Sequence, residues 1–336
     1  MLVLSPLKKI KGLFVSERIT NMNYYDDERE QVFSELEKAD SIVIFGHKNP
    51  DGDCVGSVLG MKHALKTLFP TKKVYAVGTH PAYLPVTEES DDVSDEVIEN
   101  SLALMVDLSD LERVEDQRIL KAPKIVCIDH HMKQYDVTFP IVRDEKAPSA
   151  TFIIAKCLLL RYGKIPSAEC ARYLYMGLVT DSGRFQYDAE PETLEIASKL
   201  VSYGIDYRSM YNALYRQSSI DLKYRSVIYQ NFKFDGLVTY CCMDKKTYQA
   251  LGLTQNDAGG KVNLLSMLDD HPMWAFFTEQ DDGTIRVELR SNGKYNVQKV
   301  AAQFNGGGHL AASGCKLETF DRVQEVIDAL NQTESI

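Results

Sequence analysis

Short runs of apolar, mostly β-branched residues that alternate with amphipathic segments are the feature that most constrains the fold of this chain. Four runs are expected to be strands: Ser41–Phe45, Lys73–Val77, Leu102–Asp107 and Lys124–Ile128. After the first run, apolar residues recur at helical spacing over Cys54–Phe69, before Pro70. Strands joined by helical crossovers pair in parallel. The pattern therefore predicts an α/β fold with a parallel sheet in the first half of the chain.

The pattern changes twice further along the chain. A helical block is expected first, with helices at Pro148–Tyr162, Ser167–Thr180, Pro191–Tyr203 and Tyr207–Leu214. From about Asn231 strands return, as one strand at Phe232–Met243 and a hairpin of Met273–Glu279 with Thr284–Ser291, closed at Asp281-Asp282-Gly283. Three more helices are expected at Lys261–Leu268, Tyr295–Phe304 and Asp321–Asn331. The second half should therefore form a smaller α+β domain.

The length allows two domains, because 336 residues with 44% hydrophobic content can supply two separate cores. We expect an N-terminal extension with a leading helix at Asp26–Lys38 (residues 1–40), a first domain (41–215), a linker (216–230) and a second domain (231–336). The linker is inferred from the polar stretch Arg216–Lys223.

Cysteine usage and hydropathy indicate a cytoplasmic protein with no membrane association. The seven cysteines are odd in number, dispersed and never in a C-x-x-C arrangement, as expected of reduced core residues. No apolar run approaches the length of a membrane helix, and the lysine-containing start does not resemble a signal peptide.

The net charge restricts the partners. Long nucleic acid is usually held by a basic face, whereas this chain has a formal charge of −10 and no basic run of that kind. A short phosphorylated ligand is compatible with an acidic chain, because carboxylates that bind divalent cations lose most of their negative charge. A homodimer is only a default expectation, the one that holds for cytosolic enzymes in general.

The first expected strand ends abruptly in Gly46–Asp53, a turn with one imidazole and two carboxylates. In open parallel sheets, ligands gather beyond the carboxyl ends of strands, so His47, Asp51 and Asp53 can face one crevice. An Asn-Pro-Asp-Gly-Asp stretch is also a good turn sequence. On this motif alone, a turn and a metal site are equally good interpretations.

Two further strands end in the same way. One runs into Asp107, and the next runs into Asp129, His130 and His131. Separately, Asp107 could be a cap and the histidine pair an ordinary surface or core feature. Parallel strands bring their carboxyl ends to one edge of the sheet, so these groups should converge. Asp181 follows an apolar helix and has an ordinary helix-end interpretation by itself.

Four carboxylates and two imidazoles form the candidate ligand set: His47, Asp51, Asp53, Asp107, His131 and Asp181. These donors suit Mn²⁺ best, tolerate Mg²⁺ or Co²⁺, and lack the thiolates of a structural zinc site. Two divalent cations about 3.5–4 Å apart are the usual apparatus for phosphoryl hydrolysis, in which a metal-bridging hydroxide attacks phosphorus. A structural ion without chemistry is the alternative.

These motifs closely resemble those of the DHH phosphoesterase superfamily, named after the triplet found here at Asp129–His131. The segment Gly46–Asp53, Asp107, the triplet and Asp181–Phe185 occur in the family's order and at suitable intervals. The resemblance implies a metal-dependent hydrolase of phosphoric diesters or monoesters. It also implies that the catalytic group is Asp107, His130, His131 and Asp181.

The resemblance implies a division of the metal ligands. One ion would take His47 and Asp51, the other Asp53 and His131, and both would share Asp107 and Asp181. His130 would lie beside the substrate phosphate, and Asp129 would orient an imidazole without touching a metal.

A second motif resembles the DHH-associated substrate-binding domain. Its residues, together with His130, are the expected substrate ligands: Arg290, Ser291, Gly306, Gly307, Gly308 and His309. A glycine run lets backbone N–H groups approach phosphate oxygens, and Arg290 and His309 can add charge-assisted donors. The alternative is that the glycines only end the preceding helix. Asn305 stands where the family often has a fourth glycine.

A two-domain chain of this length resembles the bacterial branch of nanoRNases, pAp phosphatases and cyclic di-AMP or pApA phosphodiesterases. The resemblance implies hydrolysis of short nucleotides such as nanoRNA, pApA or pAp, with the second domain holding the terminal phosphate. Arg216–Lys223 would be the hinge, and Phe185 and Tyr187 are candidate base-stacking residues.

Other functions stay open at this point. The enzyme could be specific for cyclic di-AMP, or it could hydrolyse inorganic polyphosphate or another small phosphorylated metabolite. A non-catalytic nucleotide-binding relative is the alternative from another class, and the presence of all six expected ligands argues against it.

Overall fold

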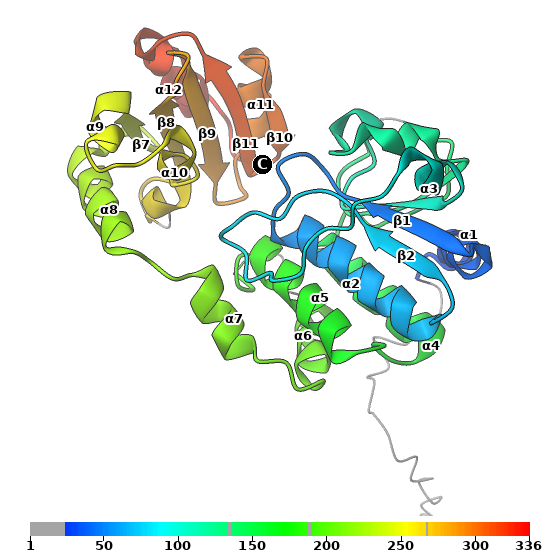
Figure 1. The fold of residues 1–336 in the computed structure, drawn as a ribbon. Coiled ribbons are helices and arrows are strands. Elements are labelled where there is room, and N and C mark those ends of the chain that lie inside the picture. The colour runs from blue at the N-terminus through cyan, green and yellow to red at the C-terminus, as the bar shows by residue number, and fades with distance from the viewer. Residues whose placement is uncertain (1–23, 134–135, 187–189, 267) are drawn as a thin grey trace, which may run out of the picture. The chain divides into compact units, whose positions relative to one another are not determined.

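The computed structural model describes residues 24–133, 136–186, 190–266 and 268–336 (Figure 1). The chain separates into two compact units, residues 1–216 and 217–336. The expected extension up to Asn21 and the candidate stacking residue Tyr187 lie outside the described residues. Among the helices that the structure describes, none is both long and apolar enough to cross a membrane.

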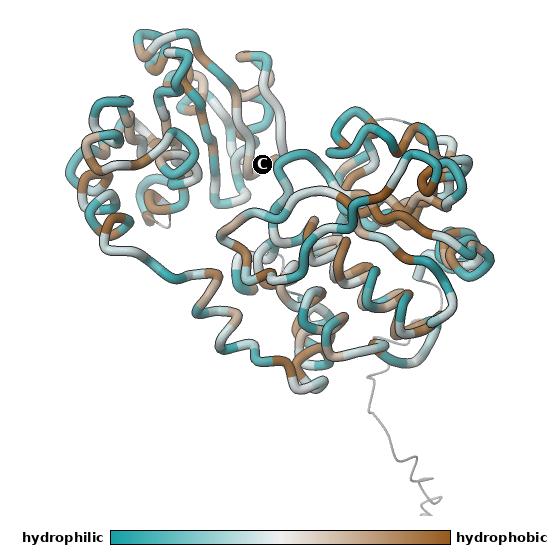
Figure 2. Tube along the Cα trace, viewed as in Figure 1, coloured by the Kyte–Doolittle hydropathy of each residue, from teal (hydrophilic) through white to brown (hydrophobic). Residues whose placement is uncertain are grey.

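The first unit is built on a five-stranded parallel sheet with the order β2-β1-β3-β4-β5. Its strands are β1 (Ser41–Phe45), β2 (Lys73–Ala76), β3 (Leu102–Val106), β4 (Lys124–Asp129) and β5 (Ile141–Arg143). Figure 2 shows β1 as a hydrophobic stretch, as expected of a strand that is covered on both faces. The predicted parallel strands are confirmed, and β5, too short to show a period, was not predicted. Because β1, β3 and β4 are neighbours, their carboxyl ends lie side by side.

Helices and short turns cover both faces of this sheet. They are α1 (Asp26–Lys38), α2 (Gly52–Leu68), α3 (Asp95–Glu99), α4 (Ala150–Tyr162), α5 (Ala168–Asp181), α6 (Pro191–Val201) and α7 (Tyr207–Leu214). In Figure 1, α2 and α5 lie on one side of the sheet and α3 on the other. A Cβ at Gly56 would approach the Tyr173 carbonyl oxygen to 2.6 Å, so glycine is needed where α2 packs on α5. The predicted helices of this unit are confirmed to within a few residues, and α3 was not predicted.

The second unit contains a six-stranded mixed sheet with the order β10-β11-β9-β8-β7-β6. Its strands are β6 (Lys233–Asp235), β7 (Val238–Met243), β8 (Met273–Glu279), β9 (Ile285–Ser291), β10 (Gly307–His309) and β11 (Ala312–Leu317). Its helices are α8 (Ser219–Asn231), α9 (Lys245–Gln249), α10 (Gln255–Ala258), α11 (Val297–Gln303) and α12 (Val323–Asn331). The predicted hairpin β8–β9 and helices α11 and α12 are confirmed.

Four local features of the second half differ from the expected secondary structure. Most of the expected linker is helix α8, whose start is fixed by a capping box between Ser218 and Asp221. The expected strand at 232–243 is the hairpin β6–β7, which turns at Gly236 (φ 54°). The expected helix at 261–268 is only a 3₁₀ turn, Val262–Leu265. Part of the glycine run is the edge strand β10, which was not expected.

Candidate metal centre

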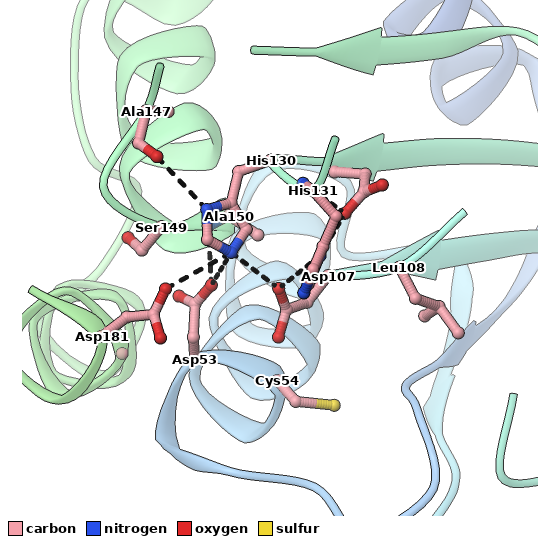
Figure 3. Close-up of polar contacts among 12 residues, drawn as sticks. Asp53, Cys54, Asp107, Leu108, His130, His131, Ala147, Ser149, Ala150 and Asp181 are labelled. Atoms are coloured by element: carbon pink, nitrogen blue, oxygen red, sulfur yellow. Dashed lines mark hydrogen bonds and ion pairs between the residues drawn. The ribbon is translucent and has the colours of Figure 1, made fainter. Parts of the chain in front are cut away.

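Side chains from three strand ends and one helix end converge at the carboxyl edge of the first sheet (Figure 3). His47 follows β1, Asp107 follows β3, and His130 follows β4. Asp181 is the last residue of α5, and it lies opposite these strand ends in Figure 3. The predicted convergence of these groups is therefore what the structure shows.

Asp107 lies at the middle of this cluster. Its side chain is 3% exposed. Its Oδ2 is 3.4 Å from His47 Nε2, and its Oδ1 is 3.4 Å from His130 Nε2 and 3.7 Å from His131 Nδ1. The backbone of Asp107 is left-handed (φ 64°), and its N–H donates to the Ile128 carbonyl at 2.9 Å. Such a conformation costs about 1–2 kcal/mol outside glycine, and here it directs the carboxylate toward three imidazoles.

Hydrogen bonds fix the tautomers of two imidazoles. His47 Nδ1 is 2.9 Å from the Lys48 carbonyl oxygen, and His130 Nδ1 is 3.2 Å from that of Ala147. Because a carbonyl oxygen only accepts, each Nδ1 donates, and in the neutral ring each Nε2 keeps its lone pair. Both Nε2 atoms face carboxylates. This is the arrangement by which proteins prepare histidine for a metal ion.

His130 lies closer than His131 to the second group of carboxylates. Its Nε2 is 3.3 Å from Asp181 Oδ2 and 3.9 Å from Asp53 Oδ2. His131 points its Nδ1 at Asp129 Oδ1 instead, at 2.8 Å, so Asp129 orients this imidazole. The expected roles were a metal ligand for His131 and a phosphate contact for His130. The distances favour the exchange of these two roles.

Asp53 also holds the beginning of α4 in place. Its carboxylate accepts hydrogen bonds from Ala150 N at 2.6 Å, from Thr151 N at 3.0 Å and from Thr151 Oγ1 at 2.6 Å. These contacts join residues almost a hundred positions apart, and no local pattern predicts them. A carboxylate at a helix N-terminus is favourable, so Asp53 supports the fold as well as the site.

Asp51 lies farther from the centre of the cluster than the other expected ligands do. Its Oδ1 caps α2 by accepting from Asp53 N and Cys54 N, both at 3.0 Å, and lies 4.0 Å from His47 Nε2. Its side chain is exposed, which leaves the other carboxylate oxygen open to a ligand from solvent.

The carboxylates of the cluster repel one another. Burial, with Asp107 and Asp181 nearby, raises the pKa of Asp53, and burial raises the pKa of Asp181 to about 7. Burial would also raise the pKa of Asp107, but hydrogen bonds from His130 and His47 hold it well below its usual range. Burial would lower the pKa of His47, whereas the hydrogen bond to Asp107 raises it to about 12. The cluster therefore requires positive charge to be fully ionised.

The donor atoms fit divalent cations. Three groups have ligand atoms within 4.8 Å of one another: His47, Cys54 and Asp107; Asp107, His130 and His131; and Asp53, His130 and Asp181. Asp107 Oδ1 is buried, and its contact with His130 Nε2, at 3.4 Å, is too long for a good hydrogen bond. A buried oxygen without a good hydrogen bond costs about 1–3 kcal/mol. A cation would satisfy it. Cys54 was not predicted, although it directly follows Asp53 in the sequence.

The second unit brings its expected phosphate ligands to one end of its sheet. His309 pairs with Ala312, which pairs with Arg290 on the next strand. Gly308 has a φ of 137°, and a Cβ there would approach the Ala312 carbonyl oxygen to 2.6 Å. The backbone of β10 is exposed. Ser291 differs from the expectation, because its hydroxyl donates to the Tyr295 carbonyl oxygen at 2.7 Å.

Comparisons with known proteins agree with this architecture. Residues 41–178 match the N-terminal domain of the DHH family, and residues 238–335 match the DHHA1 domain. The bifunctional oligoribonuclease and PAP phosphatase NrnA of Mycoplasma genitalium is 33% identical over 308 residues, covering 88% of this chain and 95% of that protein. The protein of the same name from Bacillus subtilis is 30% identical over 292 residues, covering 86% and 93%.

A solved structure shares the whole fold. The crystal structure of an exopolyphosphatase-related protein from Bacteroides fragilis aligns with a TM-score of 0.83 and 26% identity, covering 91% of this chain and 96% of that one. With both domains matched in order and relatives similar over most of their length, the chain belongs to the DHH family of phosphoesterases, in the branch that contains the NrnA proteins.

Proposed function

We propose that this protein hydrolyses short nucleotides: the phosphodiester bonds of nanoRNA and pApA, and the terminal phosphate of pAp. The observation that carries the proposal is the buried Asp107 carboxylate, whose two oxygens face three imidazoles at 3.4–3.7 Å. The names of the relatives, oligoribonuclease and PAP phosphatase, support the substrate class.

Two divalent cations, Mn²⁺ foremost, fit this centre. His47, Asp51 and Asp107 would hold one, and Asp53, His130 and Asp181 would hold the other, with Asp107 shared. Bound cations supply Lewis acidity, which activates water near neutral pH and neutralises charge on the phosphoryl oxygens. No side-chain nucleophile is then needed.

The residues of the chain orient this chemistry. The Ala147 carbonyl keeps the His130 ring in the tautomer that presents Nε2 to Asp53, Asp107 and Asp181. Asp129 holds the His131 ring through Nδ1, so its Nε2 can carry the proton that a phosphoryl or leaving oxygen requires. His131 is thus proposed as the phosphate contact and proton donor.

The second unit is proposed to bind a non-scissile phosphate. Arg290 and His309, with the exposed backbone of β10, offer cationic and N–H donors at the same end of the sheet. Binding of a phosphate rather than a base would make the enzyme select substrates by length and not by sequence. We infer a cytoplasmic location from the seven cysteines, all of which are free.

The test is product analysis with Mn²⁺, offering pApA, pAp, cyclic di-AMP and a five-nucleotide RNA to wild type and to Asp107→Asn. We expect cleavage of the linear substrates that disappears in the variant. Preferential cleavage of cyclic di-AMP would change the substrate assignment. Tight nucleotide binding without any cleavage would replace the enzyme by a nucleotide-binding protein.

Two single variants, His309→Ala and the control Ser291→Ala, test whether the second unit binds phosphate. His309→Ala should raise KM for pApA more than kcat falls, whereas Ser291→Ala should change KM little, because the Ser291 hydroxyl is bonded to Tyr295. Wild-type values of KM and kcat in His309→Ala would refute phosphate binding by the second unit.

A further inference from the structure

Cys54 lies in the first turn of α2, directly after Asp53. Its Sγ accepts a hydrogen bond from His47 N at 3.3 Å, and the residue is 1% exposed. Figure 3 shows Cys54 and Asp181 on opposite sides of the site. The thiol therefore belongs to the part of the centre near His47, away from Asp181.

The environment of Cys54 is not that of a packing residue. Cys127, Cys157 and Cys170 belong to the apolar clusters of the first unit, and Cys54 does not, although it is equally buried. Its Sγ instead lies within 4.8 Å of a ligand nitrogen of His47 and a carboxylate oxygen of Asp107. Sulfur, nitrogen and oxygen donors thus lie close enough together to share one cation.

Two independent features show that this point is prepared for a ligand. His47 Nδ1 is bonded to the Lys48 carbonyl, so Nε2 is the atom presented to the cluster. Asp107 is 2% exposed, and its Oδ2 lies 3.4 Å from His47 Nε2, so a buried carboxylate oxygen is also presented on this side. A thiol cannot by itself satisfy a buried carboxylate oxygen well, whereas a cation coordinated by all three side chains can.

We propose that Cys54 is a sulfur donor to the cation held by His47 and Asp107, which makes this position selective for thiophilic cations such as Zn²⁺ and Co²⁺. The other position, formed by Asp53, His130 and Asp181, offers oxygen and nitrogen only. Sulfur ligands favour softer cations, whereas carboxylates and imidazoles suit Mn²⁺. When the sulfur–metal bond forms, the thiol proton leaves to solvent. The inference rests on the proposed metal centre and adds a chemical difference between its two positions.

Cobalt spectroscopy tests the inference without measuring activity. Metal-free protein is titrated with Co²⁺ while near-ultraviolet absorption is recorded, because a sulfur–cobalt bond produces a charge-transfer band. Wild type should show the band, Cys54→Ser should lose it, and Cys127→Ser should keep it. Cys127 is the matched control because it is also buried, and its Sγ donates to the Leu108 carbonyl instead.

Metal affinities give a second readout. We expect Cys54→Ser to weaken Zn²⁺ binding by about tenfold or more, with a much smaller change for Mn²⁺. If serine prevents folding, Cys54→Ala is the alternative, and the wild-type spectrum is decisive without either variant. Co²⁺ binding without a charge-transfer band, or a band that survives in Cys54→Ser, would overturn the inference but not the metal centre. Failure of any Co²⁺ or Mn²⁺ to bind would overturn both.

Discussion

Replacement of Asp53 by asparagine is predicted to destabilise the metal-free protein, whereas the same replacement at Asp181 is not. Asp53 accepts three hydrogen bonds from the start of α4, at 2.6, 3.0 and 2.6 Å. An asparagine has one acceptor oxygen, and its NH₂ group would face a backbone N–H. At least one buried donor would therefore lose its acceptor.

The expected magnitude follows from these contacts. An unsatisfied buried donor costs about 1–3 kcal/mol, and loss of the charge at the helix N-terminus costs about 0.3–1 kcal/mol. Removal of the buried charge offsets part of this, because burial, and then repulsion from Asp107, raises the pKa of Asp53. The net loss should be about 2 kcal/mol, or a fall in Tm of about 4–8 °C for a unit of this size.

Asp181 provides the matched control. Burial raises its pKa to about 7, above the value in an unfolded chain, so at pH 8 its ionised form weakens the folded state. Asparagine removes that charge, and Asp181→Asn should match or exceed the wild-type Tm at pH 8 without metal.

The assay is thermal unfolding at pH 8 with EDTA, followed by far-ultraviolet circular dichroism. Tryptophan fluorescence is unsuitable because Trp274 lies in β8 of the other unit. Both variants should lose Mn²⁺-dependent hydrolysis. A Tm of Asp53→Asn equal to or above that of Asp181→Asn would refute the structural role of Asp53.

Two further predictions concern other residues of the first unit. His130→Gln should weaken Mn²⁺ binding, measured by equilibrium dialysis, by about tenfold or more, whereas His131→Gln should mainly lower kcat; the opposite pattern would restore the original assignment. Glu88→Gln should lose about 1–3 kcal/mol at pH 7, measured by urea unfolding, because Lys62 Nζ, which is buried, lies 2.6 Å from Glu88 Oε1. Burial raises the pKa of Glu88, but Lys62 and His63 lower it below its usual 4.5, so its stabilisation is present above that pH and disappears as the pH falls further. An equal difference between wild type and variant at pH 7 and pH 3 would contradict this.

The sheet of the first unit could be predicted from the sequence because hydrophobic periodicity and burial agree there. Strands β1, β3 and β4 are apolar over most of their length. A polar residue of the site follows β1 within two positions (His47), follows β3 directly (Asp107) and closes β4 (Asp129). The rule that parallel strands align their carboxyl ends then placed His47, Asp107 and His130 at one edge. These inferences need only the order and hydrophobicity of the residues along the chain.

Other features depend on contacts that have no local signal. His130 is bonded to the Ala147 carbonyl, His131 to Asp129, and Asp53 to Thr151 at the start of α4, and none of these contacts is visible in the local sequence. In the second unit, the start of α8 and the turn at Gly236 had local signals, a capping box and a glycine, that were interpreted as a linker and a continuous strand. A three-residue edge strand such as β10 has no period to detect.

The sharing of Asp107 by two cations is tested most directly by Mn²⁺ binding with electron paramagnetic resonance. We predict two Mn²⁺ per chain, with the exchange-coupled spectrum of neighbouring ions in wild type and its loss in Asp107→Asn. A single Mn²⁺ per chain, or two uncoupled ions whose spectrum is unchanged in Asp107→Asn, would contradict the shared site.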